Sequence, residues 1–171
     1  VTKTLGSNET ELEATVAQSL TAFGADGFTV GTDVSVNESS ETFVSWNWKA
    51  GTSFSNDASA TSVGTIDSSG STNQTAGFSI VSWTGTGSAG TIAHNLGSIP
   101  EWYIIKVRSG ATNNWAVYHH KSNANPEQYA LYLDGNSVAT DDSGLANDTA
   151  PTSTVFSVTS GNYANQNGYT Y

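Results

Sequence analysis

Histidines and carboxylates are the side chains of this sequence that could act as acids, bases or metal ligands. The histidines are His94, His119 and His120, and on a strand the last two would point to opposite faces, so they would not share one metal ion. A retaining glycosidase needs two carboxylates about 5 Å apart, whereas the 15 acidic residues are scattered, mostly in turn-forming sequences. Glu101 beside Trp102 is the best carboxylate–aromatic neighbour, and no G-x-S-x-G motif occurs. We therefore expect no catalytic residue and no enzymatic activity.

A calcium site is the one metal site that the acidic residues suggest. Asp141, Asp142 and Asp148 fall in one predicted loop, and carboxylate oxygens are calcium ligands. They lack the spacing of an EF-hand, so a solvated acidic loop is the preferred interpretation. The chain has no cysteine, which excludes disulfides and thiolate metal sites. We expect no cofactor.

Aromatic residues carry more signal, because the chain has 5 tryptophans and 7 tyrosines. Flat amphipathic rings suit sugar recognition, but they are also ordinary residues of β cores and interfaces. Trp115 and Tyr163 lie near amide-rich turns and are predicted to be exposed ligand contacts, together with His119. Three tryptophans in the middle of predicted strands are expected in the core instead: Trp46, Trp48 and Trp83.

Charge excludes two classes of partner. The net charge is -10 with only 5 cationic residues, and charged residues make up 12% of the chain. Nucleic-acid binding needs a basic patch, and anionic lipid attracts basic segments, so we expect neither nucleic acid nor membrane as a partner. No stretch is long and apolar enough to span a bilayer. The abundance of Ser, Thr, Asn and Gly suits an extracellular β protein.

Short alternating segments predict strands at residues 43–49, 77–83, 101–107, 115–119 and 129–133. The 101–107 segment is apolar on both faces, which favours a buried middle strand. Glu9–Gln18 has the pattern of one helical turn at most. The predicted fold class is all-β, an antiparallel β-sandwich of jelly-roll or lectin-like type, preceded by a partial copy of a similar β unit.

The chain also repeats itself. At an offset of 128 positions Phe28-Thr29-Val30 matches Phe156-Ser157-Val158, and Thr42-Phe43 matches Thr170-Tyr171. A fixed period indicates an array of similar units. We therefore expect residues 1–50 to be the C-terminal half of a preceding repeat, 51–75 to be a Ser/Thr/Gly-rich connection, and 76–171 to be a sandwich truncated at its last strand.

One motif has a clear physical interpretation as a turn. His94, Gly97 and Pro100 form the pattern H-x-L-G-x-x-P. Gly97 supplies a permissive backbone, Pro100 fixes the entry into the next strand, and His94 could bond the loop backbone. These residues are predicted to be structural.

The motifs resemble a known family. The H-x-L-G-x-x-P turn is followed by a strand ending in Lys106, by N-W-x-V-Y-H at residues 114–119 and by F-x-V at residues 156–158. This order resembles a repeat domain of tail fibres and other virion appendages of marine tailed bacteriophages, whose chains often also carry concanavalin-like lectin domains. The resemblance covers residues 76–171 well and implies a place on a virion rather than a ligand or an active site.

The expected function is a non-enzymatic structural and adhesive module of a phage tail fibre or virion appendage, located on the virion or extracellularly. Its expected partners are itself, as a homo-oligomer or fibre, other virion proteins and host surface glycans. A carbohydrate-binding or adhesin domain of a bacterial surface protein is one alternative, which the neighbouring genes would distinguish. A polysaccharide depolymerase is another, and release of reducing ends from host capsule would reveal it.

Overall fold

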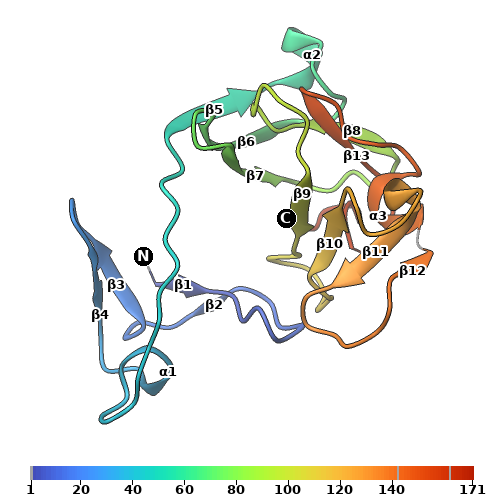
Figure 1. The fold of residues 1–171 in the computed structure, drawn as a ribbon. Coiled ribbons are helices and arrows are strands. Elements are labelled where there is room, and N and C mark those ends of the chain that lie inside the picture. Colours follow the sequence, from blue (N-terminus) through green and yellow to red (C-terminus); the bar gives the residue numbers. More distant parts are fainter. Residues whose placement is uncertain (1, 142, 162) are drawn as a thin grey trace.

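The computed structural model describes residues 2–141, 143–161 and 163–171 (Figure 1). Its regular structure is mostly antiparallel strand, and its helices span three or four residues. The predicted all-β class is confirmed, while the jelly-roll or lectin-like detail stays a prediction. The strands are β1 (Lys3–Thr4), β2 (Ala14–Thr15), β3 (Leu20–Phe23), β4 (Phe28–Val30), β5 (Thr52–Asn56), β6 (Ser68–Asn73), β7 (Phe78–Trp83), β8 (Gly90–Ala93), β9 (Trp102–Ile105), β10 (Ala116–His119), β11 (Tyr129–Tyr132), β12 (Thr140–Asp141) and β13 (Val155–Val158). The helices are α1 (Val34–Asn37), α2 (Ala58–Thr61), α3 (Ser143–Ala146) and the 3₁₀ helix η1 (Pro126–Gln128).

Residues 51–75 contain two strands of a sheet, β5 and β6, with α2 between them, so the prediction of a connection there is corrected. β5, β6 and β7 pair in that order, and every residue of β6 has a partner on β7. The buried side chains of β6 are polar but hydrogen-bonded. Ser68 Oγ donates to the Ala93 carbonyl, and the hydroxyls of Thr72 and Ser79 lie 3.0 Å apart. The buried positions of β6 are occupied by hydrogen-bonded hydroxyls instead of apolar side chains. Its Ser/Thr-rich composition is therefore the same as that expected of a flexible linker.

A second sheet contains β9 to β12 in the order β12-β11-β10-β9. Tyr103 of β9 pairs with Tyr118 of β10, and their rings stack with centroids 4.7 Å apart. The ring of Tyr103 also lies 5.1 Å from that of Phe156 on β13. β9 is an edge strand of the described sheet, so the prediction of a middle strand at 101–107 is wrong. The apolar character of this segment has another cause: on the core face, Tyr103 packs against Tyr118 of β10 and Phe156 of β13.

The last residues of the chain close the core around Trp83. β13 pairs with β8, and the Phe156 ring meets the Trp83 ring edge-on at 5.6 Å. Tyr171 stacks on Trp83 with centroids 5.2 Å apart, and its N–H donates to the Trp83 carbonyl. The Trp83 Nε1–H donates to the Ala164 carbonyl. Residues 156–171, called here the closing segment, are therefore attached to one tryptophan by a stacked ring, an edge-on ring and two hydrogen bonds.

Asn165 fixes the middle of the closing segment. It is 0% exposed, and its side-chain amide accepts from the Thr86 N–H and donates to Thr86 Oγ1 and the Ser88 carbonyl. Nearby, a Cβ built on Gly85 would lie 2.1 Å from the Gln166 carbonyl oxygen. The two backbones approach so closely that only glycine fits at position 85.

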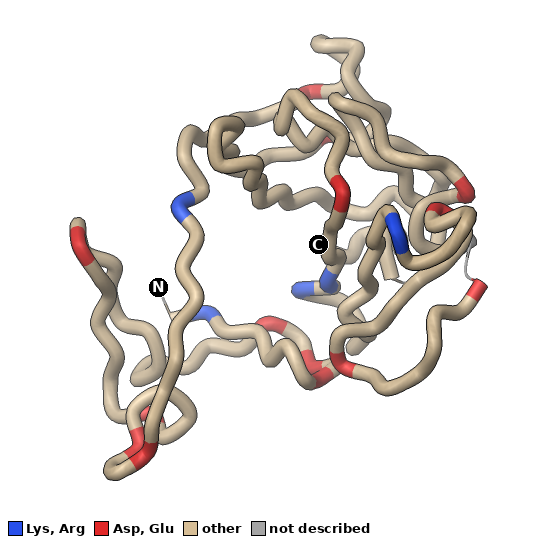
Figure 2. Tube along the Cα trace, viewed as in Figure 1, with Lys and Arg blue, Asp and Glu red and all other residues tan. Residues whose placement is uncertain are grey.

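The N-terminal residues dock on the second sheet through a buried lysine. Lys106 is 7% exposed, and its Nζ donates to the carbonyls of Thr10 and Asn113 and lies over the Trp115 ring. The Arg108 guanidinium bonds the Glu13 carboxylate at 2.7 Å. In Figure 2 the backbone after β9, which carries these cations, runs near the acidic stretch between β1 and β2. The helical turn predicted over Glu9–Gln18 is absent, because its carbonyls bond Lys106 and the Glu13 N–H bonds the Arg108 carbonyl.

Residues 20–48, called here the arm, extend away from this core (Figure 1). β3 and β4 form a hairpin, and α1 follows it. Trp46 is 75% exposed and Trp48 is 63% exposed, so the prediction that they are core residues is wrong. Trp83, at 7%, is in the core as expected. Residues 43–49 form no strand because no described strand lies beside them to accept their hydrogen bonds.

Residues 24–41 of the arm nevertheless share local turns with the residues 128 positions later, called here their twins. Four backbone hydrogen bonds recur at this offset with the same donor and acceptor positions. Ser40, with φ +69°, corresponds to Gly168, with φ +78°. A serine in the left-handed region is uncommon, so this agreement is specific. The bonds run from the N–H of Gly24 to the carbonyl of Gly27 (twins Thr152 and Val155), from Val36 to Asp33 (Ala164 and Gly161), from Asn37 to Asp33 (Asn165 and Gly161) and from Glu41 to Glu38 (Tyr169 and Gln166).

The twins Asn37 and Asn165 provide a matched test of the core. We expect Asn165→Ala to lower the free energy of unfolding by about 2 kcal/mol, because it removes the amide from its buried partners. Asn37→Ala should change it by less than about 0.5 kcal/mol, because the exposed Asn37 side chain donates only to the Gly31 carbonyl. Urea unfolding followed by tryptophan fluorescence measures both. Equal effects of the two substitutions would contradict this assignment.

Candidate functional site

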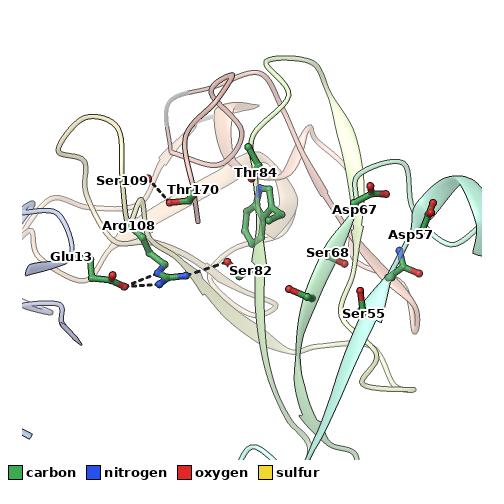
Figure 3. A pocket seen from close by; sticks show the side chains of 13 residues that line it. Glu13, Ser55, Asp57, Asp67, Ser68, Ser82, Thr84, Arg108, Ser109 and Thr170 are labelled. Atoms are coloured by element: carbon green, nitrogen blue, oxygen red, sulfur yellow. Dashed lines mark hydrogen bonds and ion pairs between the residues drawn. The ribbon is translucent and has the colours of Figure 1, made fainter. Parts of the chain in front are cut away.

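One candidate site is an open pocket of about 470 Å³ between the β5–β7 sheet, the loop after β9 and the N-terminal residues (Figure 3). Hydroxyls line much of it, with three carboxylates and one guanidinium. Trp83 contributes to the wall and Thr170 closes one side. The pocket therefore offers hydrogen-bond donors and acceptors to a polar ligand.

The charged groups of this pocket are already committed to the fold. Figure 3 shows Arg108 bridging Glu13 and Ser82. Asp57 caps α2, and the hydrogen bond from the Ser59 hydroxyl holds the pKa of its carboxyl below the usual value. Asp67 accepts a hydrogen bond from the Ala58 N–H. All four charged groups of the pocket therefore have partners within the fold.

His94 holds the predicted turn together. It is 4% exposed, its Nδ1 accepts from the Leu96 N–H at 3.1 Å, and its Nε2 lies 3.1 Å from the Thr152 carbonyl. These two contacts require a neutral ring protonated at Nε2. Burial lowers the pKa of His94. Gly97 has φ +75°, in the left-handed region, and Pro100 precedes β9 by two residues.

Trp115 has structural contacts. Its Nε1–H donates to the Gly6 carbonyl at 2.8 Å, and its backbone N–H donates to the Asp134 carboxylate. With Lys106 over the ring, this half-buried side chain holds the N-terminal residues against β10. Its predicted role as a ligand contact stays a prediction.

The three predicted ligand contacts do not meet. Tyr163 is half-buried and lies 5.5 Å from the ring of Tyr132. Tyr132 pairs with Ala116 and therefore lies on the opposite sheet face from Val117 and, by alternation, from His119. His119 is exposed at the far end of β10 from Trp115. No single ligand surface contains all three.

An exposed aromatic that the sequence analysis did not select lies beside His119. Trp102 is 53% exposed and pairs with His119 across β9 and β10. The ring of His120 lies 5.3 Å from that of His119, and its Nδ1 is 3.8 Å from the Glu101 carboxylate. Side chains alternate between the two faces of a strand, so Trp102 could have been placed opposite Tyr103, on the exposed face. Because both faces of this segment carry apolar residues, the sequence did not show which face is exposed.

Among the described residues, no group of three or more acidic or histidine side chains could hold a metal ion. Of the proposed calcium ligands, Asp142 lies outside the described residues. No helix of the described chain has the length and apolar character needed to cross a bilayer.

A family model described as "Domain of unknown function (DUF7483)" matches residues 1–171. The chain belongs to this family. The match includes the arm as well as the core around Trp83. No curated protein and no solved structure matches the DUF7483 chain.

The buried His94 of this DUF7483 domain should make stability depend on pH. Its pKa is 6.5 in the unfolded chain and lower when folded, so below about pH 6.5 the unfolded state binds a proton that the folded state does not. Stability from this residue is complete above that pH and is lost as pH falls. The decrease in melting temperature between about pH 7.5 and about pH 5 should be smaller in His94→Asn than in the wild type.

A residue without an ionisable group supplies the control. Ile80→Ala should keep the pH dependence of the wild type, because the exposed Ile80 side chain does not titrate. An unchanged pH dependence in His94→Asn would contradict the assignment of a buried, neutral His94.

Proposed function

We propose that this chain is a non-enzymatic structural and adhesive module of a bacteriophage tail fibre or related virion appendage, located on the virion or extracellularly. The observation that carries the proposal is the recurrence of the same backbone turns 128 positions apart, Ser40 and Gly168 included. A protein built of repeated β units presents surface along its length and is suited to a scaffold. The sequence resemblance to virion appendages supports the same assignment.

The described groups favour binding over catalysis. The carboxylates of the main pocket cap a helix, bond a backbone N–H or pair with arginine. His94 is occupied within its turn. Partners of the module are proposed to be further copies of itself and other virion proteins.

Host glycans are the proposed ligand of the adhesive part, at the surface formed by Trp102, His119 and His120. A pyranose can place its C–H face on the exposed Trp102 ring, while the imidazoles and the Glu101 carboxylate bond its hydroxyls. Binding at one such shallow surface is weak, and several copies in a fibre would strengthen it.

Trp102→Ala should weaken oligosaccharide binding by at least about fivefold, because it removes the stacking ring. A glycan array identifies the sugar, and a titration with that sugar gives the ratio of dissociation constants. Ile80→Ala is the matched control, because Ile80 is 55% exposed on β7, in a different sheet. An array without signal, or equal affinity of Trp102→Ala and the wild type, would reject the adhesive half of the proposal.

A further inference from the structure

We propose that the arm is the closing segment of a second copy of this β unit, so that residues 28–43 form the interface between successive units. The inference rests on the modular part of the proposed function and is independent of glycan binding. Residues 52–155, which receive residues 156–171 here, are called the seat. The second copy would offer the same seat to residues 28–43.

The seat recognises the closing segment by three features. Trp83 receives Phe156 on its edge and Tyr171 on its face. The β8 edge pairs with β13. The loop after β7 bonds the buried amide of Asn165. A segment that fits this seat must therefore present two aromatic rings, a short strand and an asparagine at fixed spacing.

The arm presents these features at the same spacing. Phe28 and Phe43 stand where Phe156 and Tyr171 stand, and Asn37 is the twin of Asn165. The recurring hydrogen bonds and the left-handed Ser40 show that the arm already has turns of the seated segment between residues 33 and 41. Because these turns are already formed, docking of the arm would cost less conformational entropy, which favours association.

Among the described residues, the arm lacks the aromatic and strand partners that hold the closing segment. Phe28 is 41% exposed and Phe43 is 48% exposed, against 6% and 3% for their twins. β4 pairs with β3 and, among the described strands, with no other. The exposed rings and the unpaired strand edge are the groups that the seat covers in the twin.

A second copy of the unit fits better than the other possible occupants. This chain's own seat is filled by residues 156–171, with Tyr171 3% exposed. Pairing of two arms would bring like charges together, because the arm carries four acidic residues without a cation: Asp26, Asp33, Glu38 and Glu41 (Figure 2). The seat also offers acceptors to the Asn37 amide, which here donates to the Gly31 carbonyl, whereas an apolar partner surface offers none.

A transplant tests the fit in the whole chain. Residues 156–171 are replaced by the sequence of residues 28–43, and a second chain carries a scrambled version of the same sequence. The transplant should unfold cooperatively with tryptophan fluorescence like that of the wild type, whereas the scrambled chain should lose the cooperative transition. If the transplant behaves like the scrambled chain, the proposal is overturned.

A tandem chain tests the interface itself. Residues 44–155 are followed directly by residues 28–171, so that residues 28–43 can close the first unit. The chain has no cysteine, so one introduced thiol reports exposure. Thr29→Cys is the probe, because Thr29 is exposed whereas its twin Ser157 is 5% exposed. Its maleimide reaction should be at least about tenfold slower in the tandem than in the 171-residue chain.

Ser39→Cys is the matched control, because Ser39 and its twin Asn167 are both exposed, so its reaction rate should be the same in the two chains. Equal rates for Thr29→Cys in the two chains would overturn the proposal. Slowing of that reaction in the 171-residue chain as protein concentration rises would also overturn it, because the arms would then cover each other. Absence of glycan binding leaves these results unaffected, so the two proposals fail separately.

Discussion

Closure of the core around Trp83 is the constraint on which the rest of the structure depends. The indole is covered by Phe156 and Tyr171, its Nε1–H bonds the Ala164 carbonyl, and its own carbonyl receives the Tyr171 N–H. These contacts join residues separated by more than 70 positions in the chain. Because they include both ring packing and directed hydrogen bonds, they determine the position of the closing segment and not only its burial.

The same constraint explains why aromatic residues of the arm are exposed and those of its twin are buried, although the two share local turns. Local hydrogen bonds among residues 24–41 form within the segment and need no partner. Burial of Phe28 and Phe43 needs a tryptophan and a strand edge from elsewhere. The N-terminal residues before the arm are held differently, through Lys106, Arg108 and Trp115, so the chain combines a docked stretch with an undocked one.

Much of the candidate surface was beyond the reach of sequence reasoning. His94 and Gly97 were placed in a turn because spacing within one motif is local information. Trp102 was named only as the neighbour of Glu101, whereas Trp115 was selected as a ligand contact. Trp102 is exposed where β9 pairs with β10, and Trp115 is engaged by the docked N-terminal residues. The pocket beside β5–β7 joins Glu13, Asp67 and Arg108, whose separation in the sequence leaves no signal.

By itself the sequence determined the all-β class, most strands of the second sheet and the 128-residue period, because alternation and repetition are properties of neighbouring positions. Tertiary structure decided which aromatic rings are buried. Trp46 and Trp83 have similar strand-like surroundings, yet one is 75% exposed and the other 7% exposed. The hydroxyl-rich β6 likewise became a central strand only through partners on β5, β7 and β8. Burial depends on what lies opposite a side chain, and that is set by segments distant in the sequence.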